Sequence, residues 1–363
     1  VFEPATNALI CTGDGLALAW SAGASMMDME MVQYHPTTLA GNGILLSEAA
    51  RGEGAHLLNS EGERFMERYA PEFMELASRD VVSRAEQIEI NEGRSVNGNV
   101  LLDLRHLGKT FIEERLGYLQ EVAVEFRGID LAEHPIEIRP GVHYIMGGIK
   151  TDIHGATVVP GLYAAGECAN VSVHGGNRLG ANSLLDTIVF GRRSAAAAAE
   201  YIKTVDSAGS SDEHLFDEMK RIQTLLDRPK GIRWAAVRNE LASSMTEGIG
   251  VFRDQASMEG ADAKVDEMKA KYAAVSVENK GKVYNTDLIF TLELEYMIDV
   301  AKTITQGALM RKESRGAHSR TDLPDRDDEN WLKHTHVFKD GDGVRTETSD
   351  VTITKWQPVE RVY

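Results

Sequence analysis

The sequence predicts an α/β protein of several domains, in which an α+β block interrupts the α/β part and a helical region follows. Three observations point to this class. Residues 162–165 form an apolar run typical of a buried parallel strand, and a glycine turn and an Ala-rich helix over about 183–202 follow it. Residues 29–149 have a mixed composition with many glycine turns. The chain after about residue 212 shows helical periodicity.

The 363 residues, of which 42% are hydrophobic, are enough to bury the cores of two or three domains. We predict four parts. The α/β domain comprises residues 1–30 and 147–205, and the inserted α+β block is residues 31–146. A helical domain is expected over 206–314, and a small C-terminal domain over 315–363.

The α/β domain is predicted to begin in its middle. Residues 8–11 read as a short buried strand that turns into an Ala- and Leu-rich helix. Gly13 and Gly15 in this turn resemble the start of a dinucleotide fingerprint, but the third glycine would fall at Leu18. We therefore expect the N-terminal dinucleotide-binding unit of this domain to be absent from the sequence.

The helical domain is predicted to be an antiparallel bundle. Six mainly apolar residues recur every four positions along one face of its last helix: Leu288, Leu292, Tyr296, Val300, Ile304 and Ala308. The apolar pattern lapses at residues 257–260, which we interpret as a loop or a helix interruption.

Charge and cysteine content exclude several classes of function. A net charge of -17 repels nucleic acid, and an anionic substrate would need its own local cluster of arginine and histidine. Two cysteines exclude a disulfide scaffold and an iron–sulfur cluster held by four cysteines of this chain alone. Any such cluster is expected on a partner. No apolar run is long enough to span a membrane.

Three segments of the α+β block place arginine, histidine or hydroxyl groups in informative positions. His35 precedes a proline, which favours extended backbone, although a packed histidine is the ordinary interpretation. Ser47 and Arg51 are four residues apart, one helical turn, in a segment that also reads as a helix end with a glycine stop. Arg79 falls in the first turn of a helix predicted over 79–92, where the helix dipole disfavours a cation. This placement suggests a role on an anion, with a surface ion pair as the alternative.

Two glycine-containing segments follow. His143 precedes an aromatic residue and paired glycines at a domain junction, where either a ligand site or an ordinary turn is expected. Residues 166–186 form a glycine-rich run before a helix. Glu167 there could bind ribose hydroxyls, and the N–H groups of Ser183 and Leu184 could stabilise an anion. The alternative is a long surface loop.

In their order and combination these segments resemble the flavoprotein subunit of succinate dehydrogenase and fumarate reductase. The resemblance runs from end to end. It is carried by Asn7 to Gly15, Asp28 to Thr37, Glu48 to Gly54, Gly62 to Pro71, Arg79 to Val82, His143 to Gly148, Gly166 to Asp186, Glu313 to Arg320 and Pro324 to Trp331.

The resemblance implies a flavin-dependent oxidoreductase that interconverts succinate and fumarate, with the α+β block as a capping domain. The residues implied to bind the two substrate carboxylates are His35, Ser47, His143 and Arg178. Arg79 would exchange the proton through a relay that includes Glu48 and Arg51. The residues implied to contact FAD are Asp14, Glu167, Ser183 and Leu184.

The resemblance also implies partners. Electrons would pass to an iron–sulfur subunit and then to quinone, and membrane anchor subunits would hold the protein peripherally at the cytoplasmic face of a prokaryotic inner or plasma membrane. Two departures from the family pattern stand out. The glycine fingerprint for the FAD diphosphate and the histidine that often links the flavin covalently lie outside this sequence, and Ser47 occupies a position that is more familiar as threonine.

Three other interpretations remain open. An L-aspartate oxidase belongs to the same superfamily and would pass electrons to oxygen or fumarate. A truncated, non-catalytic binding module would bind no flavin. His334 and His336 could chelate a metal weakly, although no third ligand is evident nearby, so no metal site is expected.

Overall fold

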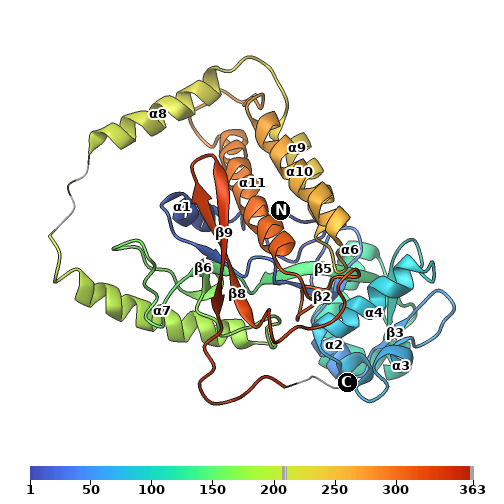
Figure 1. The fold of residues 1–363 in the computed structure, drawn as a ribbon. Helices are drawn as coiled ribbons and strands as arrows, with labels where there is room; N and C mark the ends of the chain where they lie inside the picture. The colour runs from blue at the N-terminus through green and yellow to red at the C-terminus, as the bar shows by residue number, and fades with distance from the viewer. Residues whose placement is uncertain (207–208, 210, 360–363) are drawn as a thin grey trace. The chain divides into compact units, whose positions relative to one another are not determined.

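The computed structural model describes residues 1–206, 209 and 211–359, and the chain divides into two compact units (Figure 1). The α/β unit consists of Val1–Phe2, Leu9–Met31 and Ile145–Val351. The α+β unit consists of Glu3–Ala8, Val32–Tyr144 and the described residues from Thr352 onward. In the described ranges each unit contains one sheet, and the predicted fold class is confirmed. The finer division into four domains stays a prediction.

The α+β unit is built on a four-stranded sheet with the order β2-β5-β4-β3. Its strands are β2 (Val32–Leu39), β3 (His56–Leu58), β4 (Val100–Asp103) and β5 (Ile136–Ile145). The β3–β4 and β4–β5 pairs are antiparallel. Every residue of β2 is buried, so this strand is covered on both faces. The polar side chains that β2 carries therefore lie inside the unit.

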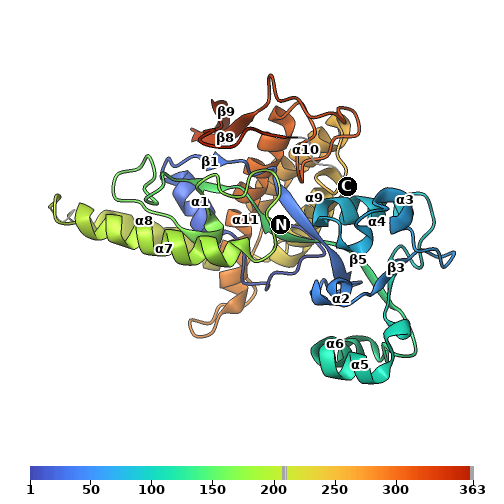
Figure 2. The ribbon, with the colours of Figure 1, turned by 90° about the horizontal axis from the view of Figure 1, so that it is seen from below.

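The helices of this unit carry the arginines discussed below. They are α2 (Ala49–Gly52), α3 (Met66–Tyr69), α4 (Arg79–Asn91), α5 (Lys109–Arg115) and α6 (Gly117–Arg127). Helix α4 packs against β2, and α5 packs against α6 (Figure 2). The core between them is aliphatic and aromatic, with Leu57, Phe65, Val82, Leu102 and Ile136 almost completely buried. Helix α4 begins at Arg79, which confirms the predicted place of this residue in a first turn.

The α/β unit contains a five-stranded sheet with the order β7-β6-β1-β8-β9. Its strands are β1 (Met26–Met27), β6 (Gly148–Lys150), β7 (Ala169–Asn170), β8 (Lys333–Asp340) and β9 (Gly343–Asp350). The β6–β7 pair is parallel, whereas β1 pairs antiparallel with both β6 and β8. The β8–β9 hairpin from the C-terminal part of the chain thus extends the sheet of the α/β unit.

Two predicted strands are wrong. Residues 162–165 do not join the sheet, because their backbone pairs locally with the preceding turn: the Ala164 N–H donates to Gly155 and the Thr157 N–H to Leu162. The parallel strand is β7, a few residues later. Residues 8–11 form a turn in which Leu9 and Ile10 are 73% and 77% exposed. Short apolar runs become strands only where a neighbouring backbone accepts their hydrogen bonds.

The remaining helices belong to the α/β unit. They are α1 (Asp14–Ser21), α7 (Asn182–Tyr201), α8 (Asp212–Asp227), α9 (Trp234–Gly248), α10 (Gln255–Tyr272) and α11 (Thr286–Met310). Helices α9, α10 and α11 pack together (Figure 1). Within the described ranges, no helix combines the length and the hydropathy needed to cross a membrane.

The helix interruption predicted at residues 257–260 is wrong, because α10 runs through it without a break. The Asp254 carboxylate accepts a hydrogen bond from the Ser257 N–H at 2.8 Å, and the Ser257 hydroxyl accepts one from the Asp254 N–H at 3.0 Å. This capping box satisfies two backbone donors at the helix start. The lapse in the apolar pattern therefore marks the first turns of a helix.

Candidate active site

Two arginines converge on one glutamate in the α+β unit. Glu48 immediately precedes α2, Arg51 lies within α2, and Arg79 opens α4. Arg79 Nη2 donates to Glu48 Oε2 at 2.8 Å, and Arg51 Nη2 donates to Glu48 Oε1 at 2.9 Å. Because the Glu48 carboxylate accepts from both guanidinium groups, it links the two arginines into a continuous chain of charge-assisted hydrogen bonds.

Both arginines at the ends of this hydrogen-bonded chain are largely buried, whereas Glu48 between them is half exposed. The side chains of Arg51, Arg79 and Glu48 are 1%, 11% and 46% exposed. Partial burial works to raise the pKa of Glu48, but the hydrogen bonds and charges of Arg79 and Arg51 hold it below its ordinary value. Burial lowers the pKa of Arg51 below the usual arginine value. Of the groups in this hydrogen-bonded chain, Arg51 is therefore the one whose positive charge burial destabilises.

Arg51 is fixed by a third group. Its Nη1 donates to the backbone carbonyl of Glu75 at 2.5 Å. The Glu75 carboxylate is itself buried and accepts from Arg64 Nε at 2.8 Å and from the Leu57 N–H at 3.1 Å. Arg51 is therefore held by the backbone of a residue whose own side chain is fixed by an ion pair with Arg64.

Two histidines lie beside this chain. Arg79 Nη1 donates to Gln33 Oε1 at 3.1 Å. Gln33 and His35 are two residues apart on β2, so their side chains leave the same face of the strand. The His35 ring meets the His143 ring edge-on, with the centroids 5.1 Å apart. Strand β2 therefore brings Arg79 and both histidines to one region of the unit.

Threonines orient both imidazole rings. The Thr37 N–H donates to His35 Nδ1 at 3.2 Å, and Thr6 Oγ1 lies 2.8 Å from His143 Nδ1. Because a nitrogen that accepts a hydrogen bond carries no proton, neutral His35 has its proton on Nε2. Ser47 is exposed, and its hydroxyl accepts from the Ala49 N–H at 3.2 Å.

Six of the predicted catalytic and substrate-binding residues thus fall in one compact unit: His35, Ser47, Glu48, Arg51, Arg79 and His143. Together they supply two guanidinium groups, two imidazoles and a hydroxyl, the side chains that proteins use for carboxylate ligands. They also supply a carboxylate that bridges the arginines. Sequence reasoning missed Gln33, although its spacing of two from His35 on a predicted extended segment was a signal for a shared face.

Arg178 belongs to the α/β unit. It is 4% exposed, and its Nη1 donates to the Leu179 carbonyl at 3.1 Å. The loop around it is attached to the start of α7 by His174, whose Nε2 lies 3.1 Å from Asp186 and whose Nδ1 lies 3.2 Å from Asn182. The glycine-rich run is therefore a structured loop with a buried arginine.

The start of α7 has the chemistry of an anion site. The preceding residue, Ala181, adopts positive φ, and no described residue accepts a hydrogen bond from the Ser183 N–H. The Leu184 N–H donates to the Ala181 carbonyl at 3.1 Å, while the Leu184 side chain is 66% exposed. A free N–H group at a helix N-terminus favours negative charge, and the exposed leucine offers apolar contact.

Two carboxylates complete the set that was predicted to contact a cofactor. Asp14 opens α1 and accepts from the Thr12 hydroxyl at 2.7 Å. Glu167 lies exposed in a short 3-10 helix, Gly166–Cys168. A helix N-terminus with a free N–H, an apolar side chain and a carboxylate able to bind ribose hydroxyls fit the parts of FAD.

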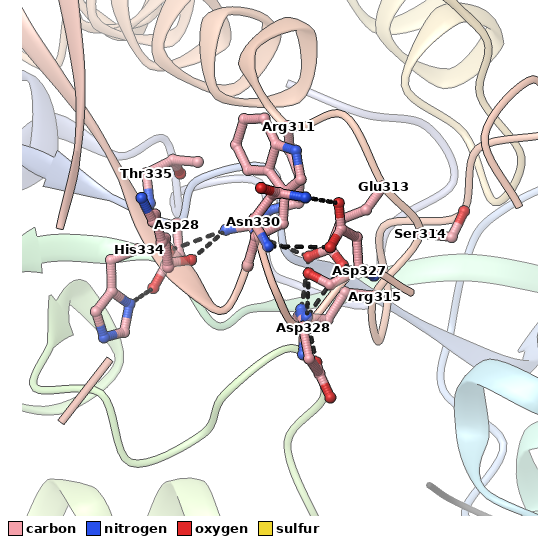
Figure 3. A network of polar contacts seen from close by, with 12 residues as sticks. Asp28, Arg311, Glu313, Ser314, Arg315, Asp327, Asp328, Asn330, His334 and Thr335 are labelled. Carbon is pink, nitrogen blue, oxygen red and sulfur yellow. Dashed lines mark hydrogen bonds and ion pairs between the residues drawn. The ribbon is translucent and has the colours of Figure 1, made fainter. Parts of the chain in front are cut away.

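A second polar network, centred on Arg311, lies in the α/β unit (Figure 3). Arg311 is 1% exposed, and its Nε donates to Glu30 at 2.7 Å while its Nη1 donates to Glu313 at 3.0 Å. Asp28 accepts from His334 Nδ1 in the same network, at 2.6 Å. These contacts join the end of α11 to β8 and to the segment after β1, which is a structural role.

The two histidines weighed as a weak metal chelate face different partners. His334 contacts Asp28 and, through Nε2 at 3.0 Å, the Ser172 hydroxyl. His336 contacts Ser25 at 3.2 Å and Ser349 at 2.7 Å. Within the described part of the chain, no cluster of three histidine, cysteine or acidic side chains has the arrangement of a metal site.

Comparisons with known proteins agree with this geometry. Residues 1–184 match the family described as "FAD binding domain", and residues 238–363 match the family "Fumarate reductase flavoprotein C-term". The chain is 43% identical to the fumarate reductase flavoprotein subunit of Haemophilus influenzae over 100% of its own length. It is 44% identical over 99% of its length to the succinate dehydrogenase flavoprotein subunit of Rickettsia conorii.

Solved structures give the same result. An Escherichia coli quinol fumarate reductase chain superposes with a TM-score of 0.96 at 41% identity, covering 100% of this chain and 65% of that one. The present chain spans 64% of the length of both curated relatives.

Proposed function

Because this chain belongs to the family of FAD-binding flavoprotein subunits of fumarate reductase and succinate dehydrogenase, we propose that the complete protein interconverts succinate and fumarate. The observation that carries this proposal is the chain Arg79–Glu48–Arg51 beside the His35 and His143 rings. It combines carboxylate-binding groups with a route for a proton inside one compact unit.

The substrate is a dianion, and the chain as a whole carries a charge of -17. Local positive charge from Arg51 and Arg79 is therefore required to attract it. We assign carboxylate binding to His35 on β2, Ser47 in the segment before α2, and His143 on β5. Fixing both carboxylates makes the reaction effectively intramolecular. The assignment of Arg178 as a further ligand rests on the resemblance of its motif.

Proton exchange at the substrate carbon is assigned to Arg79. An arginine is a poor base because its pKa ordinarily exceeds about 12. Two features support this role: the second guanidinium of Arg51 nearby, and the Glu48 carboxylate, which accepts hydrogen bonds from both arginines. In fumarate reduction Arg79 gives a proton to the substrate carbon and regains one through Glu48. Succinate oxidation reverses both transfers.

FAD, when bound, supplies or accepts the hydride. We propose that Asp14, Glu167, Ser183 and Leu184 contact it, as their chemistry permits. The N–H of Ser183 is the donor that we expect to face negative charge on the cofactor. The diphosphate is expected to be held by residues outside this chain.

We further propose that an iron–sulfur subunit takes the electrons on to quinone and that membrane anchor subunits complete the assembly. The Escherichia coli structure that superposes on this chain is a quinol fumarate reductase, which supports this proposal. The protein is then peripheral, at the cytoplasmic face of a prokaryotic inner or plasma membrane. The two cysteines of this chain, both unpaired, agree with a cluster on a partner.

Arg79 variants of the complete protein test the function. We expect Arg79→Gln and Arg79→Lys to lose about 10²–10⁴-fold in turnover of succinate and fumarate with an artificial electron acceptor or donor, as for removal of a general acid–base group. Flavin absorbance should be unchanged. Arg84→Gln is the matched control, because Arg84 lies on the same helix and pairs with Asp80.

Full turnover by Arg79→Gln would contradict the proton-transfer role. Oxidation of L-aspartate without oxidation of succinate would replace the proposed function with that of an L-aspartate oxidase.

A further inference from the structure

The proposed mechanism leaves one buried carboxyl group without a role. Glu86, on α4, has 0% exposure, and neither of its carboxyl oxygens has a hydrogen-bond partner among the described residues. A buried polar group without a partner is costly, and an isolated buried carboxylate far more so. Glu86 is therefore held as a neutral acid, and burial raises its pKa well above the ordinary glutamate value.

Arg51 is the charged group that acts on Glu86. The positive charge of Arg51 opposes the effect of burial on Glu86, and a negative charge on Glu86 would in turn stabilise Arg51. Arg51 uses Nη1 for Glu75 and Nη2 for Glu48, but its buried Nε has no acceptor among the described residues. Arg51 thus has one buried donor without a partner, and the Glu86 carboxyl group has two buried oxygens without one.

The helix register places Glu86 on the same face of α4 as Arg79, the arginine assigned to proton exchange. Glu86 follows Arg79 by seven residues on α4, close to two full turns, so both side chains leave the same face of the helix. Arg79 at the first turn is linked to Glu48, and Glu86 lies deeper along the same stripe.

Other charged groups around α4 are engaged elsewhere. On α4 itself, Glu89 accepts from Arg94 and Tyr69. The charged or titratable groups on the elements that pack against α4 also have partners. Arg68 of α3 pairs with Glu89, and Asp103 of β4 pairs with Arg105. Glu75 pairs with Arg64, and His35 of β2 accepts from the Thr37 N–H. Arg51 is therefore the group whose charge responds when Glu86 changes its protonation.

We propose that Glu86 is a positioning residue that controls Arg51, and through it the proton relay. As a neutral acid, Glu86 leaves Arg51 bonded to Glu48. When Glu86 loses its proton to solvent, its carboxylate attracts the Arg51 guanidinium at the unused Nε side, so that Arg51 shares its positive charge between Glu86 and Glu48. This inference rests on the proposed function, because it names a further residue of the same site.

Charge arithmetic sets the direction of the effect. With Glu86 neutral, Arg51, Arg79 and Glu48 together carry +1. Ionised Glu86 brings this sum to zero, which weakens attraction of a dicarboxylate. The proposed consequence is a loss of substrate affinity and of proton exchange at alkaline pH.

A test that needs no turnover is the pH dependence of unfolding of the complete protein. Because the pKa of Glu86 is raised in the folded state, its contribution to stability is present at low pH and is lost as pH rises toward that raised pKa. Glu86→Gln removes this titration. We expect the Tm of the variant, relative to wild type, to rise steadily between about pH 5 and about pH 9.

Glu89→Gln is the matched control. Glu89 lies three residues along the same helix and is equally buried, but its bonds to Arg94, Tyr69 and Asn59 lower its pKa to about 2 despite burial. Its substitution should lower Tm by the same amount at every pH in that range. A Tm difference for Glu86→Gln that is also independent of pH would show that Glu86 does not titrate there, and would overturn the proposal.

The second measurement separates KM from kcat. In the wild-type complete protein, KM for succinate should rise as Glu86 ionises, and kcat should fall over the same alkaline pH range. In Glu86→Gln both changes should move to higher pH by at least about one unit, about tenfold in proton concentration. An unchanged alkaline limb would overturn the positioning role.

If the complete protein turns over neither succinate nor fumarate, the proposed function fails, and binding of malonate by calorimetry takes the place of KM. Affinity for malonate that falls with pH in wild type but not in Glu86→Gln would support control of Arg51. Equal pH dependence in both proteins would refute it.

Discussion

Replacing Arg311 by methionine should destabilise the α/β unit by about 3–5 kcal/mol, the cost of removing one partner from a buried ion pair. Arg311 donates to Glu313 (Figure 3), to Glu30 and, through Nη2 at 2.9 Å, to the Lys333 carbonyl. Burial works to lower the pKa of Arg311, but Glu30, Asp28 and Glu313 raise it above the ordinary value. Methionine fills part of the volume but leaves these buried acceptors uncompensated.

Thermal unfolding of the complete protein measures this cost. For a unit of this size we expect a fall in Tm of roughly 10 °C. Fluorescence is a local probe, because Arg311 Cζ lies 5.9 Å from the centroid of the Trp331 ring. Arg311→Lys keeps the charge but not the fork of donors, so an intermediate loss is expected.

The matched control is Arg326→Met. Arg326 makes an exposed ion pair with Asp328, so its loss should cost less than about 1 kcal/mol. Equal unfolding midpoints for Arg311→Met and Arg326→Met would refute the conclusion that the Arg311 network supports the fold.

Two further predictions concern the same unit. Burial lowers the pKa of His336 to about 4 from an ordinary 6.5. The free energy of unfolding should therefore fall by up to about 3 kcal/mol as pH decreases from 6.5 toward 4, and His336→Gln should flatten this part of the stability–pH curve. A Cβ at Gly147 would lie 2.4 Å from the Asp28 carbonyl oxygen, so Gly147→Ala should cost about 1–3 kcal/mol in urea unfolding, whereas Gly15→Ala, with open space around it, should not destabilise.

Local sequence signals were sufficient where one side chain and one helix boundary decided the outcome. The expected helix over 79–92 is α4, and Arg79 stands at its first position. The same reasoning failed for residues 162–165, because a short apolar run does not say which backbone will accept its hydrogen bonds. Strand pairing is a tertiary property, and in this chain β1 pairs with β8, about 300 residues away.

Glu86 shows a second limit. A glutamate in a polar helix is usually solvated, and nothing in its neighbours Ala85 and Gln87 marks it as buried. Its burial follows from the packing of α4 on β2, which the periodicity of α4 alone does not reveal. Charged residues that are buried without a partner are therefore found from the structure, and they are the ones that perturbed pKa values mark as functional candidates.

Two of the buried arginines of this protein, Arg311 and Arg51, differ in a way that separates structure from chemistry. Arg311 has Glu30 and Glu313 as hydrogen-bonded carboxylates, and its pKa is raised. Among the residues that the structure describes, Arg51 has only the half-exposed Glu48 as a hydrogen-bonded carboxylate, and burial lowers its pKa. Equal burial thus has opposite results because the number of compensating charges differs. A guanidinium with too little compensation holds its proton less firmly, so we expect proton exchange to depend on Arg51 and stability to depend on Arg311.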